Sequence, residues 1–140
     1  MSKIYKPIIT KLKRISVKGG DVLHAIKKSD NSFYGFGEAY YSFINEGSVK
    51  AWKKHHKMTL NLVVPFGCVK FVFLIDSKKG VFKSEEIGEN RYLRITVPPG
   101  IWFGFKGVGP GRSLVTNFAN IEHEPNEVEK CENLDFQYKW

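Results

Sequence analysis

The stretch from Gly47 to Gly67, GSVKAWKKHHKMTLNLVVPFG, joins a cluster of basic side chains to an apolar run. The basic part holds two adjacent histidines and four lysines, Lys50, Lys53, Lys54 and Lys57. The apolar run, residues 60–64, is typical of a buried strand. Because side chains alternate between the faces of a strand, Lys53, His55 and Lys57 are predicted to share one face. In a barrel such a face lines the mouth, where small ligands bind. The alternative is a solvated edge with ordinary surface lysines.

The rest of the chain alternates between short apolar segments and turn signals. Strands are predicted over residues 11–16, 22–27, 35–45, 49–55, 59–64, 68–76, 81–87, 92–97, 101–106 and 113–120. Pro65-Phe66-Gly67 is expected to be the turn of a hairpin that joins 59–64 to 68–76. One helical turn is expected near Pro125, and the aromatic residues of 136–140 are expected to dock on the barrel. Many short strands without a long helix indicate an all-β sandwich or barrel.

The 140 residues fit a single domain, 1–140, with a net charge of +8. Residues 1–30 hold eight basic and two acidic side chains, whereas 120–140 hold two basic and six acidic ones. We therefore expect a basic N-terminal arm, about 1–18, and an acidic C-terminal segment, about 121–140, which pair within a protomer or across a dimer. No nucleic-acid motif is found, so a phosphorylated small molecule is the more economical anionic partner.

Several classes of protein are disfavoured by the composition. The apolar runs are far shorter than the roughly 20 residues of a membrane helix, and no secretory signal is recognised, which predicts a cytoplasmic protein without a membrane partner. Cys68 and Cys131 are expected to be free thiols, because two cysteines make neither a disulfide framework nor a metal-ligand spacing.

Two spacing patterns resemble the cupin double-stranded β-helix. Gly47, His55 and Gly67 match one of its motifs, and Pro98-x-Gly100 matches the other. Three of the four metal-ligand positions of that pattern are occupied by Lys53, Leu60 and Phe103. A transition metal generally needs at least three protein ligands. The sequence therefore predicts no metal site.

Residues 19–140 resemble a more specific group, the nucleotide-sugar 3,5-epimerases of the dTDP-rhamnose pathway, which are metal-free cupins. The resemblance is carried by FGEAYYSFINEGSVKAW, LNLVVPFGCVKFVFLID, VPPGIWFGF, EHEPNEVEK and the closing Trp140. It implies a cupin jelly roll, a homodimer paired through edge strands, no cofactor, and a dTDP-linked 4-keto-6-deoxyhexose as ligand. Such enzymes act in making deoxysugars for cell-surface polysaccharides such as O-antigen or capsule.

The family's functional positions are substituted in this sequence. The resemblance places Lys50 at a phosphate-binding arginine and Lys53 at the catalytic histidine. It places Leu60 at a lysine that stabilises the enolate, and Asn117 at a tyrosine that returns the proton. On the preceding strand Glu38, Tyr40 and Ser42 stand at a glutamine, an asparagine and a serine. Because the usual trio is missing, membership of the family is better supported than its reaction.

Two residues are candidate bases. Lys53 qualifies if burial and neighbouring charges lower its pKa, and His55 because an imidazole titrates near neutral pH. The alternative is that His55 is a polar residue at the mouth and the lysines bind phosphate. The predicted substrate-binding residues are Lys50, Lys57, Glu38, Ser42 and Asn117. His24 and His123 are assigned no role.

The sequence is compatible with three functions for this protein. The first is a nucleotide-sugar 3,5-epimerase-like protein with altered or lost activity, because the family positions are Lys53, Leu60 and Asn117. The second is a non-catalytic nucleotide-sugar binding protein that keeps the pocket. The third is a sugar 3,4-ketoisomerase, which also needs a base.

Overall fold

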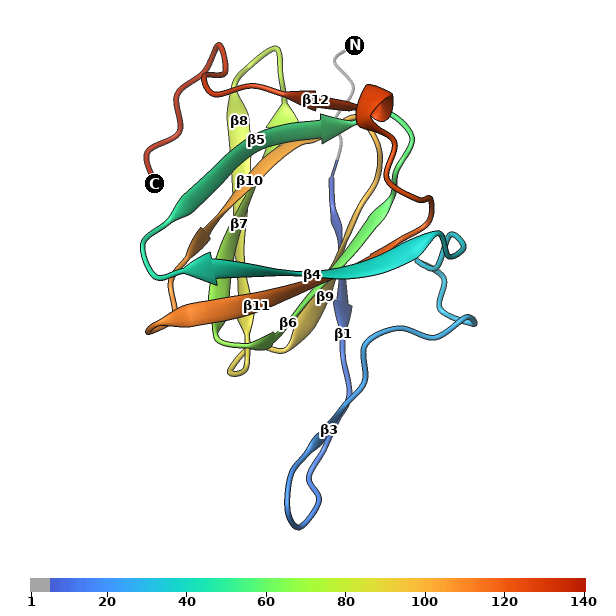
Figure 1. Cartoon of the computed structure of the whole chain (residues 1–140). Helices are drawn as coiled ribbons and strands as arrows, with labels where there is room; N and C mark the ends of the chain where they lie inside the picture. The colour runs from blue at the N-terminus through green and yellow to red at the C-terminus, as the bar shows by residue number, and fades with distance from the viewer. Residues whose placement is uncertain (1–5) are drawn as a thin grey trace.

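Two five-stranded antiparallel sheets enclose the core in the computed structural model, which describes residues 6–140 (Figure 1). The first sheet has the order β1 (Ile8–Lys11), β9 (Leu93–Val97), β6 (Leu60–Phe66), β11 (Arg112–Ala119) and β4 (Glu38–Asn45). The second has the order β12 (Val128–Lys130), β5 (Val49–His55), β10 (Trp102–Gly107), β7 (Cys68–Asp76) and β8 (Val81–Gly88). The ribbon of β2 (Arg14–Ile15) and β3 (Val22–Leu23) projects away from both sheets (Figure 1). The predicted all-β class is confirmed.

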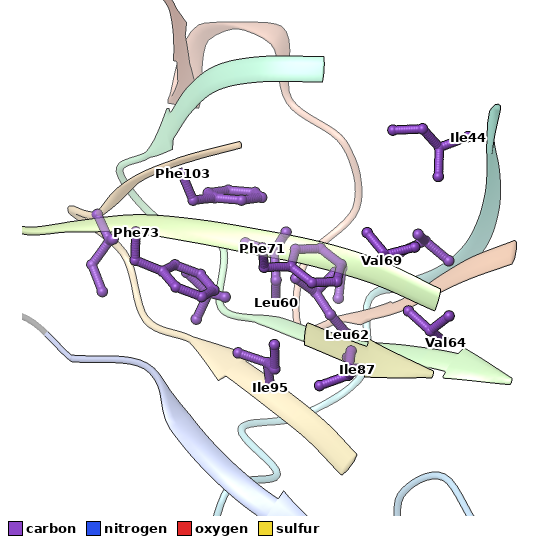
Figure 2. Close-up of a cluster of buried hydrophobic side chains, with 14 of the residues drawn as sticks. Ile44, Leu60, Leu62, Val64, Val69, Phe71, Phe73, Ile87, Ile95 and Phe103 are labelled. Carbon is purple, nitrogen blue, oxygen red and sulfur yellow. The ribbon is translucent and has the colours of Figure 1, made fainter. Parts of the chain in front are cut away.

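The core fills the space between the two sheets with alternate side chains of their strands. Leu60, Leu62 and Val64 of β6 face Phe71 and Phe73 of β7 in one buried cluster (Figure 2). These three side chains share one face because every second side chain of a strand points the same way. The apolar run of residues 60–64 is therefore at the centre of the fold.

The predicted hairpin between residues 59–64 and 68–76 is wrong. β6 continues through Phe66, and it lies in the first sheet, whereas β7 lies in the second. Gly67, with φ +87°, forms the corner at which the chain crosses from one sheet to the other. Glycine adopts such positive φ angles without a steric penalty, so the same turn signal serves a hairpin and a corner between sheets.

Replacing Gly67 by Ala is expected to lower the free energy of unfolding by about 3 kcal/mol, through backbone strain and overpacking together. A Cβ at Gly67 would stand 2.2 Å from Ser113 Oγ and 2.9 Å from Ser113 Cα. Urea denaturation measures the loss. Gly47→Ala is the control, because Gly47 has φ +79° but no atom within 4 Å of the added Cβ, so only backbone strain of about 1 kcal/mol applies. Equal losses at the two positions would contradict the corner's tight packing.

The ends of the chain are placed partly as expected. The single helical turn near Pro125 is confirmed as the 3-10 helix Pro125–Glu127, and the aromatic end docks through Trp140, whose ring centroid lies 5.3 Å from that of Trp52. The predicted strand over 11–16 is divided between β1 and β2. The first five residues of the basic arm lie outside the described residues. Among residues 6–140, no helix is long and apolar enough to cross a membrane.

Within residues 6–140, the acidic segment pairs with the end of β5 and the residues just after it, and not with the basic arm. Glu124, Glu127 and Glu129 pair with side chains of residues 54–57, at the end of β5 and just after it. β12 also hydrogen-bonds to β5 as the edge strand of the second sheet. The acidic segment therefore completes the wall that carries the histidines.

Candidate functional site

A cavity of about 190 Å³ lies between the two sheets. Strands β4, β6 and β11 of the first sheet form one wall, and β5, β10 and β12 of the second sheet form the other. The lining residues are Tyr40, Ser42, Lys50, Lys53, His55, Leu60, Leu62, Phe103, Phe105, Val115, Asn117, His123, Val128 and Lys130. The lining combines apolar side chains with a few converging polar ones, as is usual for small-molecule sites.

A bulge in β5 brings two of the lysines to the cavity. Lys53 pairs with Phe103 of β10, whereas Lys50 pairs with Phe105, so three steps along β5 match two along β10. Strict alternation would place residues 50 and 53 on opposite faces of the strand. The extra residue of the bulge turns Lys50 to the same face as Lys53, so both side chains line the cavity.

A buried hydrogen bond to Glu127 fixes His55. Its Nδ1 lies 2.6 Å from Oε2 of Glu127, and the side chains of both residues are almost completely buried. The other carboxylate oxygen, Oε1, accepts the backbone N–H groups of Met58, at 2.8 Å, and Lys57, at 3.2 Å. An ionised carboxylate only accepts hydrogen bonds, so His55 donates from Nδ1. Its Nε2 is left to take or give a proton.

The electrostatics of this pair favour a neutral imidazole beside a carboxylate. Burial lowers the pKa of His55, and the Glu127 carboxylate opposes that shift. For Glu127, burial acts to raise the pKa, but the hydrogen bonds from Met58 and His55 prevail and hold it below its usual value. At neutral pH the pair therefore presents an unprotonated Nε2, as a general base requires.

Three lysines gather on the second-sheet wall. Lys130 of β12 is the cross-strand partner of Lys53, and Lys50 lies beyond the bulge. Burial and the positive charges of Lys130 and Lys50 lower the pKa of Lys53. The Lys50 ammonium donates to the backbone oxygen of Phe43, at 2.7 Å. Three lysine ammonium groups on one wall indicate an anion subsite, because a bound anion relieves their mutual repulsion.

The first-sheet wall carries neutral polar groups. Asn117 is almost fully buried, and its Oδ1 accepts the backbone N–H of Asn61, at 3.0 Å. Its Nδ2 donates to the Tyr40 hydroxyl, at 2.9 Å. Tyr40 and Asn117 are cross-strand partners in β4 and β11, and Ser42 follows two residues later on the same face.

The structure brings five of the seven residues proposed from the sequence into this cavity: Ser42, Lys50, Lys53, His55 and Asn117. Lys57 lies beyond the end of β5, is largely exposed and pairs with Glu124, at 3.5 Å. Glu38 accepts the backbone N–H of His123, at 2.7 Å, and does not line the cavity. No group of three or more His, Cys, Asp or Glu side chains within residues 6–140 is placed to hold a metal ion.

Sequence reasoning missed four residues of the site. Glu127 and Lys130 were seen only as parts of an acidic tail, and His123 was assigned no role. Tyr40 was noted only as a substitution. Glu127 lies 72 residues from its partner His55, so no local spacing connects them. The signal that was present is the acidic segment itself, which contains the short strand V-E-K, Val128–Lys130.

Comparison with known proteins gives a consistent result. No protein-family model matches the chain. The probable low-salt glycan biosynthesis epimerase of Haloferax volcanii is 31% identical over 85 residues, which cover 57% of this chain and 54% of that protein. The chain thus spans about half the length of this curated relative.

Solved structures match nearly the whole chain. A dTDP sugar isomerase from Desulfovibrio desulfuricans has a TM-score of 0.86 and 31% identity, with 96% of this chain and 88% of that chain covered. A dTDP-4-dehydrorhamnose 3,5-epimerase from Sulfolobus tokodaii has a TM-score of 0.77 and 22% identity, covering 89% and 76%. A sugar 3,4-ketoisomerase from Thermoanaerobacterium thermosaccharolyticum, in complex with TDP, has a TM-score of 0.77 and 19% identity, covering 91% and 90%.

Two open sheets around a cavity lined by apolar and a few polar side chains, with these neighbours, define the protein as a cupin jelly roll, which confirms the predicted fold. Within the cupins, the chain belongs to the family of dTDP-sugar isomerases and related epimerases, as its 31% identity to the Desulfovibrio isomerase over 88% of that chain shows.

Proposed function

We propose that the protein is a 3,5-epimerase-like enzyme that acts on a dTDP-linked 4-keto-6-deoxyhexose, in making a deoxysugar for O-antigen or capsule. The single observation that carries this proposal is the buried His55–Glu127 pair, which opens into a cavity beside three lysines. The complex of the related ketoisomerase with TDP supports a nucleotide ligand for this cavity.

The arrangement suits proton transfer beside a ketone. A carbon-bound hydrogen next to a carbonyl needs a positioned base and a group that stabilises the developing negative charge. His55 Nε2 supplies the base, and Glu127 stabilises the imidazolium that forms. Lys53, next to His55 on the same wall, supplies a positive charge for the enolate or the diphosphate. Ser42 and Asn117 contact the sugar from the first-sheet wall, with Lys57 and Glu38 at the periphery.

The test is exchange of carbon-bound hydrogen with solvent. Incubation with dTDP-4-keto-6-deoxyglucose in D₂O is expected to place deuterium at C3 or C5, as followed by NMR and mass spectrometry. Binding without exchange would instead identify a non-catalytic binding protein. A carbonyl that moves from C4 to C3 would identify a ketoisomerase.

The rate of exchange is expected to rise with pH along a single limb whose midpoint lies below 6.5, the ordinary histidine value. The rate rises with pH because His55 accepts a proton only when it is neutral. The midpoint is low because burial lowers the pKa of His55. A pH series of kcat/KM locates the limb. A midpoint well above 6.5 would assign the proton transfer to another group.

Replacing Lys53 by Met is expected to weaken the binding of dTDP about tenfold, because one of the three positive charges of the anion subsite is lost. Lys54→Met is the matched control, since Lys54 lies on the opposite face of β5 and pairs with Glu129, at 3.2 Å. Isothermal titration calorimetry measures both variants. Equal affinities for the two would place the diphosphate elsewhere.

We also propose that the enzyme acts as a homodimer in the cytoplasm. Support for the dimer comes from apolar side chains on the outer face of the first sheet. Phe43 of the edge strand β4, Leu114 and Phe66 form a cross-strand row, and Phe43 and Phe66 are at least half exposed. An exposed row of this kind suits a second copy of the chain.

A further inference from the structure

The hydroxyl of Tyr40 is oriented by a chain of hydrogen bonds that begins at the backbone. The N–H of Asn61 can only donate, so the atom of Asn117 that faces it is the carbonyl oxygen, Oδ1. The amide nitrogen of Asn117 must then face the Tyr40 oxygen, to which it donates. Asn117 is 2% exposed, so this orientation is held by packing as well.

A phenol that accepts this hydrogen bond keeps its own proton for another partner. Among the hydrogen bonds of residues 6–140, the Tyr40 hydroxyl donates to no protein group, and the side chain lines the cavity. If Tyr40 loses its proton, the Asn117 N–H remains as a donor to the phenolate oxygen. Tyr40 is thus arranged to give a proton to a ligand and to recover it from water.

Tyr40 and His55 lie on opposite walls of the cavity. Tyr40 belongs to β4 of the first sheet, whereas His55 belongs to β5 of the second. Burial, together with the charges of Glu38 and Glu127, raises the pKa of Tyr40, so the phenol is protonated at neutral pH. A flat enolate between the walls would have a base on one face and a proton donor on the other.

We propose that Tyr40 is the proton donor that inverts the sugar carbon, an assignment that rests on the proposed function. His55 Nε2 takes the hydrogen from the carbon beside the ketone, and the C–H electron pair becomes that of the enolate. The Tyr40 O–H then gives its proton to the opposite face of the same carbon. This forms the new C–H bond and restores the ketone. The imidazolium returns its proton to water, and the phenolate takes one up, so the cycle needs no other reactant.

The test separates the two proton transfers in the Tyr40→Phe variant. With dTDP-4-keto-6-deoxyglucose in D₂O, formation of the inverted sugar is expected to fall about 100-fold, the scale of a lost general acid. Exchange of the same hydrogen, which needs only His55, is expected to fall less than about tenfold, within the range of a perturbed neighbour. Tyr41→Phe is the matched control, because Tyr41 is 71% exposed on the other face of β4, and it should leave both rates unchanged.

Each other outcome overturns the inference in a distinct way. If Tyr40→Phe forms the inverted sugar at the wild-type rate, Tyr40 is not the donor, although the proposed function stands. If exchange and inversion fall equally, Tyr40 has a structural role only. A wild-type protein that exchanges without inverting a carbon also refutes the role of Tyr40. A wild-type protein that shows neither exchange nor conversion refutes both the proposed function and the role of Tyr40.

Discussion

Replacing His55 by Asn is expected to lower the rate of solvent exchange by about 10³-fold, which is within the range for loss of a general base. The amide nitrogen of Asn occupies nearly the place of the imidazole Nδ1, so the variant can still donate to Glu127. The buried carboxylate therefore keeps a partner, and the fold should survive. What disappears is Nε2, the proposed base. Exchange measured by NMR, with circular dichroism as the check on folding, tests this result.

His56→Asn is the matched control for this experiment. His56 is the next residue, half exposed, and its Nε2 lies 2.9 Å from Glu129 on the outer side of the second sheet. It should keep wild-type exchange within about twofold, the usual effect of a change at an exposed pair. If His55→Asn also kept the wild-type rate, the base would be another residue, and Lys53 would become the first candidate.

Replacing Glu127 by Ala is expected to reduce the free energy of unfolding by about 3–5 kcal/mol, because three donors at a buried site lose their acceptor, at a cost of about 1–3 kcal/mol for each fully buried one. The variant removes the acceptor of the Met58 and Lys57 backbone N–H groups and the partner of His55. These groups lie where the acidic segment joins the end of β5, so the second sheet would lose its edge strand more easily. Urea denaturation at pH 7 measures the change.

Glu129→Ala supplies the comparison, because Glu129 is half exposed and pairs with Lys54 and His56 at the surface. It should cost less than about 1 kcal/mol, as surface ion pairs do. The pKa of Glu127 is depressed in the folded protein, so its stabilisation is present above the ordinary value of 4.5 and is lost as the pH falls through the folded value. Equal losses in the two variants at pH 7 would contradict the role of Glu127.

Much of the fold was predictable from local pattern. The strand Val49–His55 and the strand Cys68–Asp76 have the bounds that the sequence indicated, because each begins just after a glycine turn and continues until the next polar loop. The local sequence does not determine which strands pair with each other. Gly67 marks a turn in the sequence, but whether the chain returns in the same sheet or crosses to the other depends on what both strands bury.

Alternation along one strand predicted only part of the site, and the family resemblance supplied Ser42, Lys50 and Asn117. Lys53 and His55 are two residues apart, and alternation places both on the wall of the cavity. Lys50 reaches the same wall through a bulge, which no composition signal marks. Glu127 and Lys130 arrive through the pairing of β12 with β5, a contact between distant segments. Long-range pairing of this kind is decided by the assembled core and not by neighbouring residues.

The most direct test of the central claim is a crystal structure of the protein with a bound dTDP-4-keto-6-deoxy sugar. We expect the diphosphate beside Lys50, Lys53 and Lys130, the sugar between the two sheets, and His55 Nε2 within about 3 Å of a hydrogen on the carbon next to the ketone, the reach of a general base. A nucleotide sugar bound outside this cavity, or inside it with His55 turned away from the ring, would contradict the account.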